Sequence, residues 1–521
     1  MKASFGDRRQ DTQNDQPGIP PPRPLGAPVD EVSQWPLAAL DWTALPNSQS
    51  AIEPTNQQLG LEKPPSAGPK RLSRIRIALV ATIVMIAAVI GAVLWWPAAP
   101  VDEPPLPNPP VELPEDLPGA EVCATQTDTW IIRVCTSDAS SFSDVLATDN
   151  GTLIAVGDVY SHDGDLASFV QEAWGVLAHI DPTATATLDM VLSGTYQTIA
   201  SAPDGTIVAA GTFYEDSEFT PVVDKLDAAG RLLWRQTLGG AQFQDGRDLA
   251  NQRFAVTVGT DGGIILLQSG IIVGQANPLL MKFSPDGTLQ WAHDVDQTSD
   301  GGHFLWGVTE AVDGSIYVVG QTDGTGSIFP DSSPGSAVVK FSAKGKLIWA
   351  KTYGELYFSS VAAAANGGIV TGGASAQTDN FPINKGSFDA SVAMINPAGN
   401  LVWATTLGGS SDDRITDIDI SPDGHIIVVG FTFSADGDFS GHRGTSPQLD
   451  LSDAFVARLT TNGTLQWAKT FGGSDADGFN GVFAAPNGDI VAVGRISSTD
   501  GNLPTNTILL RLTPTGDIAP R

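Results

Sequence analysis

Beyond residue 140 the apolar positions recur in a short pattern that favours β-hairpins. A turn dipeptide, Asp-Gly or Asn-Gly, is followed by five or six mostly apolar residues, as in HIIVVG after Asp423-Gly424. Glycine reaches positive φ without steric cost, so such a dipeptide between two apolar runs predicts two antiparallel strands and a tight turn. The turn glycine occurs seven times, at Gly151, Gly205, Gly262, Gly314, Gly367, Gly424 and Gly488.

Each copy contains two further elements. The first is another apolar run, such as the one that begins with FVARL at Phe455, and the second is a run that leads into tryptophan, such as GTLQW at Trp467. The glycines are 52 to 64 residues apart, so each unit has room for four short strands, which is the size of one propeller blade. A β-sandwich also uses short strands, but it does not repeat so regularly. The sequence therefore predicts an all-β, seven-bladed β-propeller within residues 122–521.

The tryptophans hold a fixed place in the repeat, which favours packing between blades over a sugar-binding platform. The first copy departs from the pattern, because Leu188 stands where tryptophan is expected. The predicted packing residues are Trp130, Trp234, Trp291, Trp349, Trp403 and Trp467.

The two ends of the array complement each other. The seventh copy stops at Arg521 before its tryptophan strand, and residues 130–138 align without gaps with residues 467–475. Trp130 lies 21 residues before Gly151, the same interval as between Trp467 and Gly488. We therefore expect the N-terminal strand to complete the last blade and close the ring, which removes exposed sheet edges.

An uncharged apolar run precedes the array. Residues 77–96 contain no charged side chain, and 20 helical residues span about 30 Å, the thickness of the hydrocarbon core of a bilayer. Lys70, Arg71, Arg74 and Arg76 precede this run and two tryptophans end it, which predicts a single transmembrane anchor (71–97) with the N-terminus in the cytoplasm. A buried soluble helix and a cleaved signal peptide are the alternatives. The propeller would then lie outside the cell (inner) membrane, in the periplasm or the extracellular space.

The segments on either side of the anchor are rich in proline. Residues 1–70 contain few aliphatic side chains and predict a disordered cytoplasmic tail. Within this tail, residues 20–24 fit either a polyproline ligand or a linker, and residues 34–45 fit either a docking motif for a cytoplasmic partner or a residual apolar run. Residues 98–121 predict a stiff, extended spacer.

The repeat units resemble a known family. The segments WATTLGGSSDDRITDIDISPDGHIIVVGFT from Trp403, QTDNFP from Gln377 and FVARL from Phe455 are similar to the bacterial SBBP β-propeller repeat. The resemblance covers the whole region after the spacer and implies a bacterial, extracytoplasmic propeller. It implies no catalytic residues.

Charge and cysteine content narrow the function. The formal net charge is −30, with +1 up to Trp96 and −31 beyond it, which argues against nucleic acid as a partner. Cys123 and Cys135 are too few for a cysteine metal site. Outside the membrane they fit a disulfide better than two free thiols.

The loops that follow the second strand of each unit, and the links between units, contain many aspartates. Examples are residues 434–438 (SADGD), 410–413 (SSDD) and 474–477 (SDAD). Such clusters fit Ca²⁺ ligands, but aspartate is also common in turns, and no copy has the spacing of a true calcium loop. No cofactor is therefore predicted, with calcium as the alternative.

The histidines are not arranged as catalytic or metal-ligand motifs. None of the six lies in HExxH, and no GxSxG sequence occurs. A triad assembled from different blades stays open, because triads are defined by geometry. We therefore expect a non-enzymatic, membrane-tethered module that recognises a protein, peptide or glycan on its acidic loops. The alternatives are a propeller hydrolase or lyase acting on an envelope or extracellular polymer, and a scaffold without a specific ligand.

Overall fold

The structure is a computed structural model. It describes residues 129–134, 140–148, 150–158, 173–183, 186–192, 194–215, 218–238, 252–270, 278–296, 302–324, 327–329, 334–354, 356–376, 385–440, 451–503 and 505–520. All of them belong to the unit Pro104–Arg521.

The described residues form seven four-stranded antiparallel sheets. Blades 1 to 3 contain β2 (Ser141–Ala147), β3 (Leu153–Asp158), β4 (Ala173–Ile180), β5 (Ala186–Leu192); β6 (Gly194–Ser201), β7 (Ile207–Glu215), β8 (Glu218–Leu226), β9 (Leu232–Thr237); β10 (Gln252–Val258), β11 (Ile264–Gly270), β12 (Leu279–Phe283) and β13 (Leu289–Asp294). Blades 4 to 6 contain β14 (His303–Glu310), β15 (Ile316–Thr322), β16 (Gly335–Phe341), β17 (Leu347–Thr352); β18 (Leu356–Ala363), β19 (Ile369–Ala376), β20 (Phe388–Ile395), β21 (Leu401–Leu407); β22 (Asp413–Ile420), β23 (Ile426–Thr432), β24 (Asp453–Leu459) and β25 (Leu465–Phe471). Blade 7 contains β26 (Gly478–Ala484), β27 (Ile490–Ile496), β28 (Asn506–Leu512) and β1 (Ile131–Val134).

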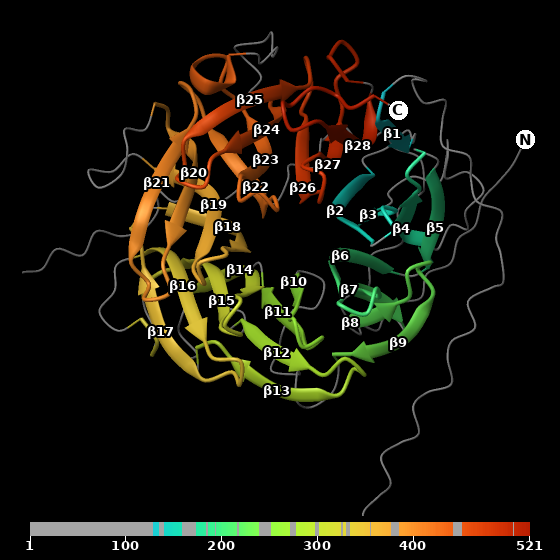
Figure 1. Cartoon of the computed structure of the whole chain (residues 1–521), viewed down its shortest axis with the longest axis vertical. Coiled ribbons are helices and arrows are strands. Elements are labelled where there is room, and N and C mark those ends of the chain that lie inside the picture. Colours follow the sequence, from blue (N-terminus) through green and yellow to red (C-terminus); the bar gives the residue numbers. More distant parts are fainter. Residues whose placement is uncertain are drawn as a thin grey trace, which may run out of the picture. The chain divides into compact units, whose positions relative to one another are not determined.

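The seven sheets surround a common axis (Figure 1). The first strand of each blade (β2, β6, β10, β14, β18, β22 and β26) lies nearest the axis, and the fourth strand lies at the outside. This arrangement confirms the all-β, seven-bladed propeller. Because neighbouring strands are antiparallel, the turns between strands 1–2 and 3–4 lie on one face of the ring, named here the turn face. Connections between strands 2–3 and between blades lie on the other face, the loop face.

The ring closes through the N-terminal strand, as the repeat count predicts. β1 pairs with β28, with Ile131 opposite Leu510 and Val134 opposite Thr507. The main chain of Trp130 adds two hydrogen bonds, from its N–H to the Ala519 carbonyl (2.9 Å) and from the Arg511 N–H to its carbonyl (3.1 Å). Blade 7 therefore contains both ends of the array.

The hydrophobic core is divided among the blade interfaces. Seven clusters of buried apolar residues each join two neighbouring blades. Ile132, which is 1% exposed, lies in the cluster between blades 7 and 1. Burying one such side chain contributes about 1.5–3 kcal/mol, so β1 stabilises both its own sheet and the next interface.

The turns differ in one respect from the simplest hairpin. In the turn of blade 6, Gly424 has a φ of +83°. Among the described non-glycine residues only Asn506 has positive φ, so the aspartate of the dipeptide stays on the ordinary side of the φ map. Ser421 N–H donates to the His425 carbonyl (2.9 Å) and Gly424 N–H to the Ser421 carbonyl (2.7 Å). The loop is thus longer than two residues, and only its glycine needs the left-handed region.

Several predictions from the sequence fall outside the described residues. These are the tail (1–70), the anchor (71–97, with the apolar run 77–96), the spacer (98–121) and both cysteines, Cys123 and Cys135. Within the ranges that the structure describes, no helix has the length and apolar character needed to span a bilayer.

Candidate functional site

The turn face is held together by a repeated ion pair, named here the clamp. In blade 2, Lys225 on the third strand donates to Asp204 of the Asp-Gly turn (2.7 Å) and to the carbonyl of Pro285 in blade 3 (3.2 Å). Arg458 does the same in blade 6, with Asp423 (3.0 Å) and the carbonyl of Pro514 in blade 7 (2.7 Å). Corresponding ion pairs are Lys282–Asp261, Lys340–Asp313 and Arg511–Asp489.

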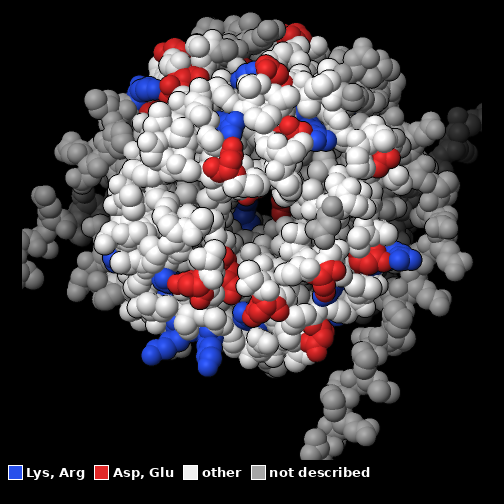
Figure 2. Space-filling view, viewed as in Figure 1, with Lys and Arg blue, Asp and Glu red and all other residues white. Residues whose placement is uncertain are grey.

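The turn residue matches its partner in six of the seven blades. Blades 1 and 5 have asparagine in the turn, Asn150 and Asn366, and there the third strand carries His179 and Met394 instead of lysine or arginine. Blade 7 departs from this pattern, because its turn has asparagine while its third strand carries Arg511, which pairs with Asp489 after the turn glycine. Where the pair is present it stabilises the ionised carboxyl, since hydrogen bonds from Lys225 and Thr206 lower the pKa of Asp204 to about 2. The clamp therefore neutralises charge and links one blade to the next. Figure 2 likewise shows basic and acidic side chains side by side around the ring.

On the loop face, the last aspartate of the segments 408–413 (GGSSDD) and 472–477 (GGSDAD) forms a buried contact, named here the staple. The Asp413 carboxylate accepts hydrogen bonds from the Gly409 N–H (3.0 Å), the Ser434 hydroxyl (2.9 Å) and the Thr432 hydroxyl. In blade 7, Asp477 accepts from Gly473 N–H (3.0 Å), as well as from the segment after the second strand. Burial raises the pKa of Asp413 to about 6. The staple ties the link between blades to the loop after the second strand.

The acidic loops predicted as the recognition surface bind the same links. Asp436 accepts from the Ser410 N–H (2.7 Å), and Asp500 accepts from the Ser474 N–H (2.8 Å). Asp438 accepts from the Gly408 N–H (3.1 Å). These carboxylates bond to backbone amides, which is the usual role of aspartate in turns. Among the described side chains no group of three or more His, Cys, Asp or Glu is placed to hold a metal ion.

Blade 4 contains a hydrogen-bonded set that resembles a catalytic triad in connectivity. His303 Nε2 lies 2.9 Å from Asp296 Oδ2, and His303 Nδ1 lies 2.8 Å from the Thr322 hydroxyl. The side chains of His303 and Asp296 are 0% exposed and Thr322 is 4% exposed. A substrate has no access to this hydroxyl, so the set replaces the Asp413 staple of blade 6 in the equivalent position. His162 and His442 lie outside the described residues.

The first strands surround an axial opening, the channel, in which basic and acidic atoms are visible (Figure 2). Six of these strands carry a β-bulge with one extra residue, namely Ser143, Gln197, Trp306, Ser359, Thr416 and Asn480. Four of them donate to a carbonyl of the next blade, as Thr416 does to Phe479 (2.7 Å) and Asn480 does to Phe142 (2.8 Å). The bulges thus cover the inner edge of each sheet.

Three aspartates reinforce this inner ring. Asp144 accepts from the Ile199 N–H of blade 2 (2.9 Å), and Asp417 and Asp419 accept from Val482 and Ala484 of blade 7 (2.9 and 2.8 Å). Burial, followed by the charge of Asp417, raises the pKa of Asp144 to about 7, and burial raises the pKa of Asp419 to about 7. The pKa values of Asp144 and Asp419 thus lie near neutral pH, although the contacts of both carboxyls are those of structural groups.

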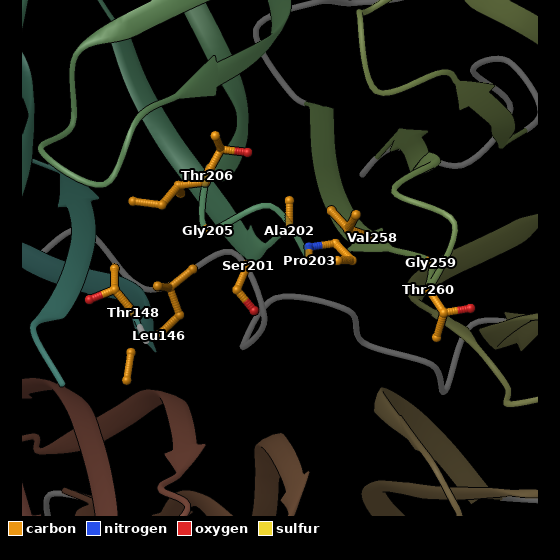
Figure 3. Close-up of a pocket in the computed structure, with 12 residues that line it drawn as sticks. Leu146, Thr148, Ser201, Ala202, Pro203, Gly205, Thr206, Val258, Gly259 and Thr260 are labelled. Atoms are coloured by element: carbon orange, nitrogen blue, oxygen red, sulfur yellow. The ribbon is translucent and has the colours of Figure 1, made fainter. Parts of the chain in front are cut away.

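A hollow of about 280 Å³ opens among the strand 1–2 turns of blades 1 to 3. Figure 3 shows its wall coming from three neighbouring turns, with Thr148, Ser201, Pro203 and Thr260 among the labelled residues. None of its twelve lining residues is an acid, a histidine, a cysteine or a lysine. The hollow therefore offers no acid–base pair.

The repeat tryptophans face the turn of the following blade. A methyl group added at Gly287 would lie 3.1 Å from the Trp234 ring, and one added at Gly463 would lie 2.6 Å from the Trp403 ring. Trp467 donates its indole N–H to the Pro514 carbonyl (3.1 Å), and Trp349 to the Pro397 carbonyl (3.2 Å). A methyl group at Gly345 or Gly516 would meet Trp291 or Trp467, and Trp130 is 4% exposed with Arg511 over its ring.

Comparisons with known proteins return the propeller fold and little more. No family model and no curated protein matches the chain, so the resemblance to the SBBP repeat stays a prediction. Among solved structures, the chain is similar to the WD40 β-propeller domain of Doa1, with 12% identity and a TM-score of 0.42 over 75% of this chain and 96% of that one. It is also similar to XC5397, a gluconolactonase from Xanthomonas campestris, with 13% identity and a TM-score of 0.33 over 59% and 87%.

The clamp and the staple are absent from the sequence-based predictions. A signal for the clamp was present, because in every blade but the seventh the turn has aspartate where the third strand has lysine or arginine and asparagine where it does not. The staple had a weaker signal, namely an aspartate four residues after the second glycine of a Gly-Gly pair, as in Gly409 and Asp413.

Proposed function

We propose that the protein is a membrane-tethered, extracytoplasmic binding module that recognises a protein, peptide or glycan on the loop face. The observation that supports this most is the contrast between the two faces. The turn face carries short turns joined by clamps. The strands that flank the long connections 159–172, 239–251 and 441–450 have their connected ends at the loop face, where the ring fixes them. Variable connections on a rigid frame are the usual place for recognition.

The staples change which groups would contact a partner. Asp413, Asp436 and Asp477 already bind backbone amides, so recognition would use the outer surface of the loops. A basic partner, or one bridged by cations such as Ca²⁺, suits the charge of −31 beyond Trp96. The anchor at residues 77–96 would hold the module at the membrane, and the tail would offer a cytoplasmic partner a binding segment.

A hydrolase or lyase is the second candidate on sequence grounds, but no observation favours it. The set of His303, Asp296 and Thr322 is buried, and the hollow on the turn face has no acid–base pair.

The test uses the full chain in detergent and a partner first identified by cross-linking in envelope fractions, then purified. One variant replaces residues 441–450 with a Gly-Ser segment of equal length. The control is Val312→Ser, since Val312 is 70% exposed on the turn face. We expect the purified partner to bind the wild type and the control equally, and the loop variant at least tenfold more weakly, in assays run with and without Ca²⁺. Equal binding by the loop variant would contradict the proposal.

The tether has its own test. Deleting residues 77–96 should move the protein from the membrane fraction to the soluble fraction. Retention in the membrane fraction would show that another segment holds it there.

A further inference from the structure

Arg253 lies on the inner wall of the ring and has no partner among the described residues. It is the second residue of β10, the strand of blade 3 nearest the axis, and lies opposite Ser269. Its guanidinium makes no hydrogen bond or ion pair with any residue that the structure describes, although the side chain keeps exposed surface. Burial among the surrounding protein lowers its pKa. A side chain enclosed by protein yet open to solvent is what a channel position produces.

This isolation is unusual within the chain. Lys225, Lys282, Arg458 and Arg511 all pair with carboxylates. Arg414, the second residue of the corresponding strand β22 in blade 6, lies 3.7 Å from Asp412 and over the Phe388 ring. Because Arg253 is exposed to solvent, its N–H donors, which no described residue occupies, are open to a ligand.

A second polar group on this strand pair also lacks a partner among the described residues. Ser269 is 0% exposed, and its hydroxyl makes no hydrogen bond with a described residue. Ser269 lies directly opposite Arg253, so both side chains are on the same face of the sheet, toward blade 4. In blade 4 the extra residue of the bulge is the half-buried Trp306.

The inner hydrogen-bond ring is interrupted at the same place. Gln197, Ser359, Thr416 and Asn480 each donate to the next blade. β10 has no bulge, and the Trp306 indole N–H makes no hydrogen bond within the described part of the chain. Between blades 3 and 5, therefore, the wall presents unused donors instead of a closed polar ring.

We propose that Arg253, with Ser269 opposite it on the neighbouring strand, binds an oxyanion group, a carboxylate or a phosphate or sulfate ester, of a ligand that enters the channel. The planar guanidinium presents paired N–H donors that match such a group in two parallel hydrogen bonds. The Ser269 hydroxyl adds a neutral donor. This site is separate from the loop-face site of the proposed function.

The channel carboxylates do not make it a cation site. Asp144, Asp417 and Asp419 on blades 1 and 6 bond to backbone amides of the next blade. Their oxygens are occupied by structural contacts, whereas the donors of Arg253 are free among the described residues.

The experiment follows the thermal unfolding of the full chain in detergent against sodium sulfate, with sodium chloride of equal ionic strength as reference. Sulfate is the probe because its charge is constant from pH 5 to 9. The variants are Arg253→Gln, Arg253→Lys and the control Arg414→Gln, which removes the same charge from the corresponding strand position. Citrate and inorganic phosphate then distinguish a carboxylate from a phosphate ligand.

We expect a saturable rise of Tm with sulfate in the wild type and in Arg414→Gln, a smaller rise in Arg253→Lys and none in Arg253→Gln. Without sulfate, Arg253→Gln should be at least as stable as the wild type, because it removes an uncompensated charge. A saturable rise of Tm that persists in Arg253→Gln would overturn the site. So would the absence of any saturable rise in the wild type with sulfate, citrate and phosphate. Neither result depends on residues 441–450. The sulfate experiment can therefore contradict this site without contradicting the loop-face proposal, and the loop replacement can do the reverse.

Discussion

Replacing Asp144 with asparagine tests whether the inner ring uses carboxyls for structure. Asp144 accepts hydrogen bonds from the Val145 N–H (2.8 Å) and the Ile199 N–H (2.9 Å), one on each oxygen. Its pKa rises from the ordinary 3.8 to about 7, first through burial and then through the charge of Asp417. Between these two pH values the folded chain keeps a proton that the unfolded chain has lost. The stability of the wild type therefore falls as the pH rises across this window.

The magnitudes predict a change of sign. A rise in pKa from 3.8 to about 7 corresponds to about 4 kcal/mol lost when the folded carboxyl ionises. Asparagine has no such loss, but its amide NH₂ faces one of the two backbone N–H groups, which costs about 2 kcal/mol. Asp144→Asn should therefore be less stable than the wild type by about 2 kcal/mol at pH 3, below both pKa values, and more stable by about 2 kcal/mol at pH 9, above both.

The assay is the thermal unfolding of both proteins at pH 3 and pH 9, measured by calorimetry. The order of the two Tm values should invert between these pH values. Adding Asp417→Asn to the wild type should lower the pKa of Asp144, because it removes the second cause of the rise. If Asp144→Asn is less stable by the same amount at both pH values, the carboxyl is not ionising at a cost and the reasoning fails.

Three other experiments each test a separate contact. Lys225→Met and Asp204→Asn should each destabilise the protein. The double variant should be about 1 kcal/mol more stable than the sum of the two single effects predicts, since blade 5 has methionine and asparagine in these places. Additive effects in denaturant unfolding would argue against the clamp. Gly463→Ala should lower the free energy of unfolding by at least about 1 kcal/mol more than Gly354→Ala does. Both glycines have positive φ, but only at Gly463 would the added methyl group meet a tryptophan ring. Equal melting temperatures of the two variants would exclude that packing. Cys135→Ser should lower Tm under oxidising but not reducing conditions, and an unchanged Tm would count against the disulfide.

The repeat could be predicted from the sequence because each blade packs through the same residue types at the same positions. Turn glycines such as Gly424 and the tryptophans before each outer strand recur at fixed places, so strand order and ring closure followed from counting. The staple was harder to predict. Asp413 and Asp436 look like exposed, acidic loop residues in the sequence, and their partners are backbone amides that only the folded ring brings near.

The channel could not have been predicted from the repeat. The extra residue in the first strands depends on the pairing register, as between Ile415 and Asp417, and this register is not visible in the spacing of the glycines. The sequence does not distinguish Arg253 from other arginines, because whether it has a partner depends on the residues that the fold places around it. Trp306 and the missing bulge in β10 are departures from the repeat, so the spacing of the repeat does not predict them.

A cross-link between the two ends of the array tests ring closure most directly. In a background with Cys123→Ser and Cys135→Ser, Arg133→Cys is combined with Ile508→Cys, its register partner, or with Leu509→Cys as control. Side chains of successive residues point to opposite faces of a strand, so only the first pair can form a disulfide. Mass spectrometry should find the linked peptide in the first variant and not in the second. Equal linkage in both, or none in either, would contradict a propeller closed by its N-terminal strand.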